Sequence, residues 1–280
     1  MDKNIERFKV DIEKVSLVEI EIFSYCNRQC WFCPNSFIDR HSTNILMDEN
    51  LYLKILSELK AINYSGTISY SRYNEPTSHK EIFLERLRQA REYLPNARLH
   101  TNTNGDYITK EYIDELCSAG LNSLFIQCYL KKDEIFDNQK LKERIIKKAN
   151  DLGLEYNFIK DIHDRVDAKF EHKDMLIRMY ARDFKVNGNF RAGTLDTIKP
   201  QKRNRPCYTI FREIYIDHNG SVMPCCNFRS DIKEHEKFIL GNVKDNNVFD
   251  IFNGETNLKL RSILCNKEFD LYPCCECTFT

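Results

Sequence analysis

The sequence predicts an α/β fold, a partial TIM-like barrel followed by a small second domain. From residue 15 to about 160, strand-like and helix-like segments alternate, which is typical of βαβ units and a parallel sheet. A polar, proline-bounded stretch over 199–206 then precedes a different pattern. We therefore expect a partial (β/α)6 barrel over residues 1–198, and a C-terminal domain built from a β-hairpin and helices over residues 199–280.

Strands are predicted where β-branched and aromatic residues gather between polar turns. Five segments meet this criterion: 15–25, 66–73, 97–105, 122–130 and 154–161. A sixth strand is possible within 173–184, which could equally be a helix. Because crossover connections are right-handed, the carboxyl ends of these strands should meet at one edge of the sheet, and we expect the functional site there.

Helices are predicted where apolar residues recur at helical spacing. The segments are 48–62, 79–94, 109–120 and 138–153. Asp48 stands where an N-cap is expected, and Gly120 where a helix would end. In the C-terminal part, Asn219-Gly220 marks the turn of a hairpin over 211–226, and short helices are expected within 246–264.

Composition excludes several classes of function. Lys plus Arg and Asp plus Glu both number 42, so the zero net charge offers no general attraction for nucleic acid or an anionic membrane. An apolar run of about 18 residues, as a transmembrane helix needs, is missing from the sequence. The N-terminal stretch MDKNIERFKVDIEK is charged and unlike a signal peptide. We expect a cytoplasmic protein without nucleic-acid or membrane partners.

Twelve cysteines are distributed unevenly along the chain. Three lie within 26–33 and seven within 207–277. A disulfide framework is not expected, because the cytosol keeps thiols reduced. Two clusters of cysteines in such a chain instead predict two metal centres.

The first cysteine cluster follows the first predicted strand with the spacing C-x3-C-x2-C, at Cys26, Cys30 and Cys33. Three thiolates are one too few for a closed tetrahedral site. A fourth ligand from elsewhere in the chain would make a zinc knuckle. Alternatively, the three thiolates hold a [4Fe–4S] cube whose fourth iron binds a small molecule.

This loop resembles that of the radical S-adenosylmethionine (SAM) superfamily in spacing, in position, and in the aromatic residue before the third cysteine, here Phe32. The resemblance implies a [4Fe–4S] cluster that binds SAM, with Phe32 near the adenine. The sequence SRYNEP stands where the family has a Gly-Gly-Glu-Pro-like turn. Glu75 would then accept hydrogen bonds from the SAM ammonium, and Tyr73-Asn74 replaces the glycine pair.

Two further strand ends extend the same resemblance. TNTNG at 101–105 is similar to the Thr-Asn-Gly turn of the family, which implies that Asn102 and Asn104 contact the ribose or the carboxylate of SAM. Gln127, at the end of the next predicted strand, is a further candidate for SAM binding.

The C-terminal cysteines show the pattern C-x12-G-x4-C followed by C-x2-C, which resembles the SPASM/Twitch group of the superfamily. Because the chain ends three residues after the last cysteine, the shortened Twitch form with one auxiliary [4Fe–4S] cluster is expected. The implied ligands are Cys207, Cys225, Cys274 and Cys277. Cys226 and Cys275 adjoin proposed ligands and could exchange with them, although neighbouring side chains on extended backbone point apart.

The resemblance implies reductive cleavage of SAM to a 5′-deoxyadenosyl radical, which removes hydrogen from an unactivated carbon. Electron loss to the auxiliary cluster would then give dehydrogenation. Hydrogen return from a thiol would give epimerisation, which we favour because Cys226, Cys265 and Cys275 lack an evident ligand role. Short Twitch-type relatives include both an aminocyclitol dehydrogenase and aminoglycoside-sugar epimerases. A flavodoxin- or ferredoxin-type protein is the expected reductant.

Only about 14 residues precede the first predicted strand, too few for the peptide-recognition domain common in peptide-modifying relatives. This favours a small polar substrate, such as a sugar, an aminocyclitol or a nucleotide sugar, and Arg191 is a candidate for binding it. Two alternatives stay open. The chain could modify a ribosomal peptide, or it could be a non-catalytic iron–sulfur or zinc module.

Overall fold

The computed structural model describes residues 3–265 and 270–277 and contains one mixed sheet of ten strands. The strands run in the order β10-β9-β8-β1-β2-β3-β4-β7-β6-β5. Six neighbouring strands are parallel and form the curved centre of the molecule: β8 (Glu213–Ile216), β1 (Leu17–Ile20), β2 (Thr67–Ser69), β3 (Arg98–Thr103), β4 (Ser123–Gln127) and β7 (Met175–Arg182). The predicted α/β fold with a parallel sheet is confirmed.

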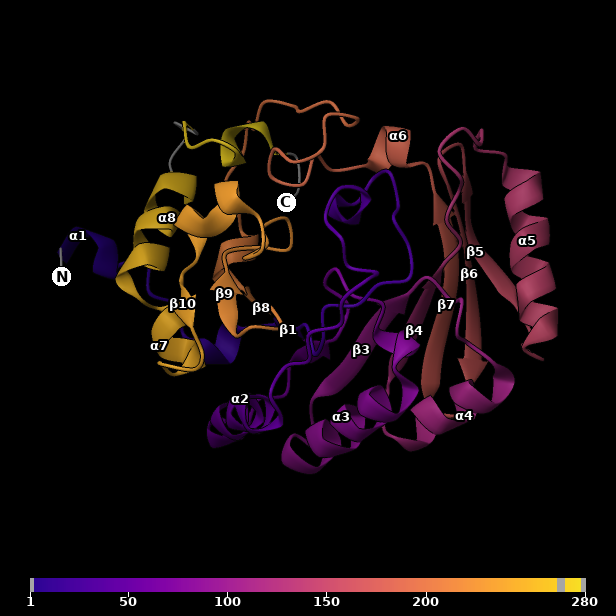
Figure 1. The fold of residues 1–280 in the computed structure, drawn as a ribbon, viewed down its shortest axis with the longest axis horizontal. Helices are drawn as coiled ribbons and strands as arrows, with labels where there is room; N and C mark the ends of the chain where they lie inside the picture. Colours follow the sequence, from indigo (N-terminus) through magenta and orange to yellow (C-terminus); the bar gives the residue numbers. More distant parts are fainter. Residues whose placement is uncertain (1–2, 266–269, 278–280) are drawn as a thin grey trace.

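Helices cover the outer face of this sheet (Figure 1). They are α2 (Glu49–Ala61), α3 (Lys80–Tyr93), α4 (Lys110–Ser118) and α5 (Asn138–Asp151). The predicted cap of α2 is present, since Asp48 Oδ1 accepts a hydrogen bond of 3.1 Å from the Leu51 backbone nitrogen. These helices begin and end close to their predicted positions, because caps and apolar spacing are local features of the sequence.

Side chains alternate between an apolar outer face and a polar inner face of the sheet. On β1, Val18 and Ile20 are buried against the helices, whereas Glu19 points to the opposite side. On β3, Leu99 packs outward and Asn102 lines an inner cavity. The apolar core therefore lies between sheet and helices, and the concave inner face is left for polar groups.

The fifth predicted strand differs from the prediction. Strand β5 (Asn157–Ile162) is an exposed edge strand, antiparallel to β6 (Arg165–His172), instead of the next parallel strand of the barrel. The parallel position beside β4 belongs to β7, which lies in the segment 173–184 that could have been strand or helix. Burial decides this order: β7 is buried at every second residue, while β5 is mostly exposed.

The C-terminal part contributes to the same sheet. Strand β8 pairs in parallel with β1, and the predicted hairpin continues from β8 into β9 (Ser221–Met223) through Gly220 at φ +87°. Strand β10 (Gly241–Asn242) pairs with β9. The predicted short helices are α7 (Val248–Phe252) and α8 (Glu255–Cys265). The sheet is therefore continuous across the domain boundary that we predict near residue 199.

Short elements complete the described part of the chain. They are α1 (Lys3–Glu6), α6 (Phe184–Asn187), and the 3₁₀ turns η1 (Ile12–Lys14), η2 (Pro34–Ser36), η3 (Pro76–Ser78), η4 (Thr209–Phe211), η5 (Lys233–Phe238) and η6 (Cys274–Glu276). Within the described ranges, every helix is too short or too polar to cross a lipid bilayer.

Candidate functional site

The three N-terminal cysteines lie on the loop that follows β1 and face a cavity of about 230 Å³ on the inner side of the sheet. The Cys26 backbone nitrogen donates to the Arg40 carbonyl (2.9 Å), and the Cys33 nitrogen donates to the Cys30 carbonyl (2.9 Å). Burial raises the pKa of Cys26 to about 11 and that of Cys30 to about 12. Nearby thiols contribute to both shifts, which shows that the three side chains converge.

The three thiols share one cavity wall, which bears on whether they hold a single ion or a cluster. Among the described residues, no group of three or more His, Cys, Asp or Glu side chains is close enough to hold one metal ion. In an iron–sulfur cube each thiolate binds a different iron, so the sulfur atoms lie farther apart than the ligands of one zinc ion. Three thiols of one loop at the wall of one cavity can hold three irons of a [4Fe–4S] cluster there.

Glu75 lies in the same cavity wall and is held by its neighbours. Its Oε1 accepts hydrogen bonds from the Thr77 hydroxyl (2.7 Å) and the Thr103 hydroxyl (2.6 Å). Its Oε2 accepts one from the Asn104 backbone nitrogen (2.7 Å). Burial raises the pKa of Glu75, although these hydrogen bonds oppose the shift. Since a carboxylate oxygen has two lone pairs, Oε2 retains the capacity to accept a hydrogen bond from an ammonium group.

The other residues predicted to bind SAM also line this cavity. Phe32 stacks on Phe184, with ring centroids 3.5 Å apart. The Asn102 amide donates to the Ser71 hydroxyl (2.8 Å). The amide nitrogen of Gln127 is buried and has no hydrogen-bond partner among the described residues, although its oxygen accepts from Tyr180. A buried donor without a partner, aimed into a cavity, fits a site that binds a polar molecule.

The side chain of Asn104 is already committed to the loops around the cavity. Its amide nitrogen donates to Asn27 Oδ1 (2.8 Å), and its oxygen accepts from the Asp106 backbone nitrogen (2.9 Å). Asn104 therefore shapes the cavity rim, while its backbone nitrogen orients Glu75.

Arg191 enters the cavity from the segment after β7. Arg191 and Ala192 both have positive φ values, +49° and +53°, an unusual backbone for residues other than glycine. Asn189 Oδ1 accepts a hydrogen bond of 2.9 Å from the Arg191 backbone nitrogen, which stabilises this turn. Burial lowers the pKa of the nearby Arg182, and the charge of Arg191 contributes to this shift. Two guanidinium groups of like charge therefore line one cavity, as expected where a polar ligand binds.

The four cysteines predicted to bind the auxiliary cluster line a second cavity. They are Cys207, Cys225, Cys274 and Cys277. The rest of this wall includes Ile210, Phe228 and Leu260. Asn189 and Asn227 direct amide nitrogens to Cys277 Sγ, at 3.9 and 3.8 Å. An apolar pocket with four thiols and amide donors to sulfur suits a fully protein-bound iron–sulfur cluster.

The spare cysteines have three different locations. Cys226 lines the first cavity, one residue from Cys225 in the wall of the second. Cys265 is the last residue of α8, near Cys207. Cys275 lies in η6 and lines neither cavity. Cys226 and Cys275 therefore lie apart from the cavity that their neighbours Cys225 and Cys274 line. Of the three spare cysteines, only Cys226 lines the first cavity.

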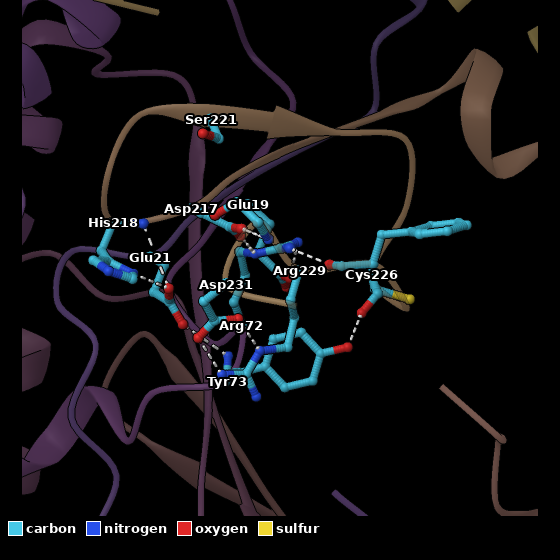
Figure 2. Close-up of polar contacts among 12 residues, drawn as sticks. Glu19, Glu21, Arg72, Tyr73, Asp217, His218, Ser221, Cys226, Arg229 and Asp231 are labelled. Carbon is cyan, nitrogen blue, oxygen red and sulfur yellow. Dashed lines mark hydrogen bonds and ion pairs between the residues drawn. The ribbon is translucent and has the colours of Figure 1, made fainter. Parts of the chain in front are cut away.

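Buried charges connect the two halves of the inner face (Figure 2). Glu21 on the β1 side is fully buried and accepts a hydrogen bond of 3.0 Å from Arg40 Nη1. It also pairs with His218 Nδ1 at 2.7 Å, from the turn between β8 and β9. Although burial opposes the shift, Arg40 and His218 hold the pKa of Glu21 well below its usual value. Glu21 is therefore an ionised link between the N- and C-terminal parts.

A second chain of contacts reaches the cysteine loop. Asp231 pairs with Arg40 (2.8 Å) and with Arg229 (2.6 Å). Arg229 Nη1 donates to Asn35 Oδ1 (2.7 Å), and the Asn35 amide nitrogen donates to the Tyr73 carbonyl (2.8 Å). The C-terminal part is thereby tied to Asn35, which stands two residues after Cys33 and lines the first cavity.

Several residues of the first cavity were missed by sequence reasoning. They are Glu19, Arg28, Asn35, Ser71, Arg72, Tyr73, Asn74, Thr103, Tyr129, Tyr180, Arg182 and Phe184. Acidic residues inside the apolar strand VSLVEIEIF are a visible signal, because a buried parallel strand rarely carries charge without a role. Arg182 and Phe184 could be found only by assigning β7 as a strand.

Comparisons with known proteins agree with this geometry. The model of the radical SAM superfamily matches residues 20–163, and that of the SPASM iron–sulfur cluster-binding domain matches residues 207–278. The S-adenosyl-L-methionine-dependent 2-deoxy-scyllo-inosamine dehydrogenase of Niallia circulans is 26% identical over 250 residues, which cover 89% of this chain and 86% of the relative. The narrower Twitch assignment stays a prediction.

Solved structures show the same fold. BtrN in complex with AdoMet and 2-DOIA superimposes with a TM-score of 0.68 at 22% identity, over 95% of this chain and 94% of BtrN. BtrN in an open conformation gives a TM-score of 0.60 at 21% identity, over 94% and 91% of the two chains.

The radical SAM match includes Cys26, Cys30 and Cys33 of the first cavity. The SPASM match includes the four cysteines that line the second cavity, Cys207, Cys225, Cys274 and Cys277. The cofactors are therefore SAM and two iron–sulfur clusters. Because the radical SAM model spans more than half of the sequence, this chain is a member of the radical SAM superfamily.

Proposed function

We propose that this enzyme inverts a secondary-alcohol carbon of a small polyhydroxylated substrate, and that the thiol of Cys226 returns the hydrogen atom. The observation that carries the proposal is the position of Cys226. Its side chain lines the same cavity as Cys26, Cys30 and Cys33, while the four auxiliary cysteines line another. A thiol that is not needed as a ligand, beside the reacting centre, is a suitable hydrogen donor.

The residues of the first cavity divide into two groups. When bound, SAM and its cluster supply the abstraction of a hydrogen atom from carbon. Glu75, backed by Thr77 and Thr103, holds the ammonium group of SAM, and Phe32 packs beside its adenine. Arg191, which also lines this cavity, binds the substrate.

Every bond that breaks during the return of hydrogen is matched by a bond that forms. Removal of the carbinol hydrogen leaves a carbon radical on the substrate. The S–H bond of Cys226 breaks, and its hydrogen atom forms a new C–H bond on the opposite face. The sulfur radical left on Cys226 then takes one electron from the flavodoxin- or ferredoxin-type reductant and one proton from water, which restores the thiol.

The character of the cavity supports the substrate class. Ser71, Asn102 and Tyr180 present hydroxyl and amide groups to the cavity, which suits a ligand rich in hydroxyl groups. The aminocyclitol dehydrogenase that resembles this chain over most of its length supports the same choice. We therefore place aminocyclitols first, before sugars and nucleotide sugars.

Dehydrogenation is the second candidate, and a specific observation favours it. The relative is a dehydrogenase, and Cys225 in the second cavity directly precedes Cys226 in the first. A substrate radical beside Cys226 is thus close to the auxiliary cluster. Loss of one electron to that cluster and of the hydroxyl proton would leave a carbonyl group.

Turnover in deuterated water separates the two candidates. The holoenzyme is incubated with SAM, dithionite and a panel of aminocyclitols that includes 2-deoxy-scyllo-inosamine, and the products are analysed by mass spectrometry and NMR. Epimerisation predicts one deuterium at an inverted carbon, and Cys226→Ala should prevent its incorporation. A ketone product without deuterium at that carbon would support dehydrogenation, and SAM cleavage that modifies no member of the panel would refute this substrate class.

A further inference from the structure

Glu19 and Arg72 form a charged pair on the inner face that the roles assigned above do not use. Glu19 lies on β1 and Arg72 follows β2, and both line the first cavity together with Cys226. Figure 2 draws these three residues with Asp217 in one group. Glu19 and Arg72 are also electrostatic neighbours of Cys226. The pair therefore lies beside the proposed hydrogen donor.

The guanidinium of Arg72 is only partly used by the protein. Its side chain is 0% exposed. Its Nε lies 2.5 Å from Asp217 Oδ1, and its Nη2 donates to the Phe228 carbonyl (2.7 Å). Among the described residues, its Nη1 has no hydrogen-bond partner, and the carboxylate oxygen of Glu19 nearest to it is 3.9 Å away. A buried cationic donor without a partner is costly, which points to a bound group at this position.

Glu19 offers the complementary acceptor. Its Oε2 accepts a hydrogen bond from the Ser69 hydroxyl (3.0 Å). Its Oε1 is the atom 3.9 Å from Arg72 Nη1, a distance too long for a hydrogen bond. An acceptor and a donor thus stand side by side at the cavity wall, each with capacity for one more bond.

The chemistry of this pair selects the group that it can bind. An ammonium group has only donors, so it would satisfy Glu19 and repel Arg72. A phosphate or carboxylate has only acceptors, so it would satisfy Arg72 and repel Glu19. A hydroxyl group both donates and accepts, and is neutral, so it satisfies both residues at once.

We propose that Glu19 and Arg72 bind the hydroxyl group of the reacting carbinol, which donates to Glu19 Oε1 and accepts from Arg72 Nη1. The inference rests on the proposed function and names the part of the substrate that this wall recognises. The inference holds for epimerisation and for dehydrogenation, because the carbon that bears this hydroxyl lies beside Cys226 in either reaction.

The ionisation of Glu19 suits this role. Burial raises its pKa to about 7, Glu213 and Glu21 act in the same direction, and Arg72 and Ser69 oppose them. A carboxyl group that titrates near neutral pH can accept a proton from a bound group. If the substrate is oxidised, Glu19 can take the hydroxyl proton while the electron passes to the auxiliary cluster, which leaves the C=O bond.

The test measures binding to the holoenzyme, with SAM present and with 2-deoxy-scyllo-inosamine and scyllo-inositol as probes in calorimetry. Glu19→Gln removes the charge and keeps the shape, and Glu19→Asp keeps the charge and shortens the side chain. Glu213→Gln is the matched control, because Glu213 is a neighbouring glutamate that bonds to Tyr215 and does not line the cavity. Cleavage of SAM without polyol reports whether the cofactor site is intact.

Glu19→Gln should raise the dissociation constant by about 10- to 100-fold, the range for a lost hydrogen bond to a charged group. Glu19→Asp should fall between this variant and the wild type, Glu213→Gln should stay within about twofold, and cleavage of SAM without polyol should be equal in all four proteins. Equal affinity of Glu19→Gln and the wild type for a bound probe overturns this inference and leaves the proposed function standing. Loss of SAM cleavage in Glu19→Gln has the same consequence. Failure of the wild type to bind either probe overturns the substrate class and this inference together.

Discussion

The two cysteine-lined cavities of this enzyme differ in what surrounds the sulfur atoms. The first has the three thiols of the N-terminal loop and the spare thiol of Cys226, in a wall of charged and hydroxyl-bearing side chains such as Glu75. The second has four thiols in a wall that includes Ile210 and Leu260. Three thiolates leave one iron of a cube without a protein ligand, and four leave none. The comparison teaches that the cavity in which molecules must bind and react has polar surroundings. The cavity suited to electron transfer has apolar surroundings.

Removal of one thiol from each cavity should have the largest and most unequal effects. Cys30→Ala should abolish SAM cleavage and lower the iron content by about four per chain, because two thiolates hold a cube poorly. Cys274→Ala should lower the iron content by the same amount and still cleave SAM. Iron analysis and quantification of 5′-deoxyadenosine check both. Equal loss of SAM cleavage in the two variants would contradict the division of roles.

Substitution of the thiol between the cavities should be nearly as severe for product formation. Cys226→Ala should abolish product formation while SAM cleavage continues, because the substrate radical then has no positioned hydrogen donor. Cys265→Ala is the matched control, since Cys265 lies at the end of α8 and outside both cavities. The measurement is the ratio of product to 5′-deoxyadenosine. Full product formation by Cys226→Ala would refute the thiol donor.

The buried ion pairs that join the halves predict a loss of stability. Arg40→Ala removes the guanidinium partner of the buried Glu21 carboxylate, and should lower the free energy of unfolding by about 3 kcal/mol, the cost of breaking a buried pair. Arg144→Ala, at a surface pair with Glu134, should cost less than about 1 kcal/mol. Urea unfolding of the anaerobic holoenzyme measures both. Similar losses in the two variants would show that the buried network does not couple the halves.

The smallest predicted effect is a pH dependence of polyol binding in the first cavity. Because burial raises the pKa of Glu19 to about 7, its carboxylate form grows as the pH rises through 7. Affinity for 2-deoxy-scyllo-inosamine should therefore increase by about tenfold from pH 6 to pH 8, an increase that Glu19→Gln should remove. Calorimetry over this range checks it. A dependence that persists in Glu19→Gln would assign the titration to another group.

The local features of the fold were predictable from the sequence, whereas the order of its strands was not. Asp48 and the apolar spacing after it determine α2 by contacts within one helix. The antiparallel placement of β5 depends on β6 and β7, which return along the sheet and take the position beside β4. Such long-range pairing leaves no mark within the segment 154–161 itself.

The candidate site shows the same division. The cysteines and Glu75 were predictable because each stands directly after a strand, at a fixed spacing or in a recognisable turn. Arg182 was not, because its position depends on the end of β7. The assignment of Cys226 to the first cavity and Cys225 to the second also required the structure, since adjacent residues of one type carry no sequence signal of direction.

Electron–nuclear double resonance with ¹⁵N-amino-labelled SAM tests the difference between the cavities most directly. The reduced protein should show a hyperfine coupling between this nitrogen and a cluster, and Cys274→Ala should retain that coupling unchanged. A coupling that disappears in Cys274→Ala and persists in Cys30→Ala would place the cofactor at the wrong cluster, and would contradict the account.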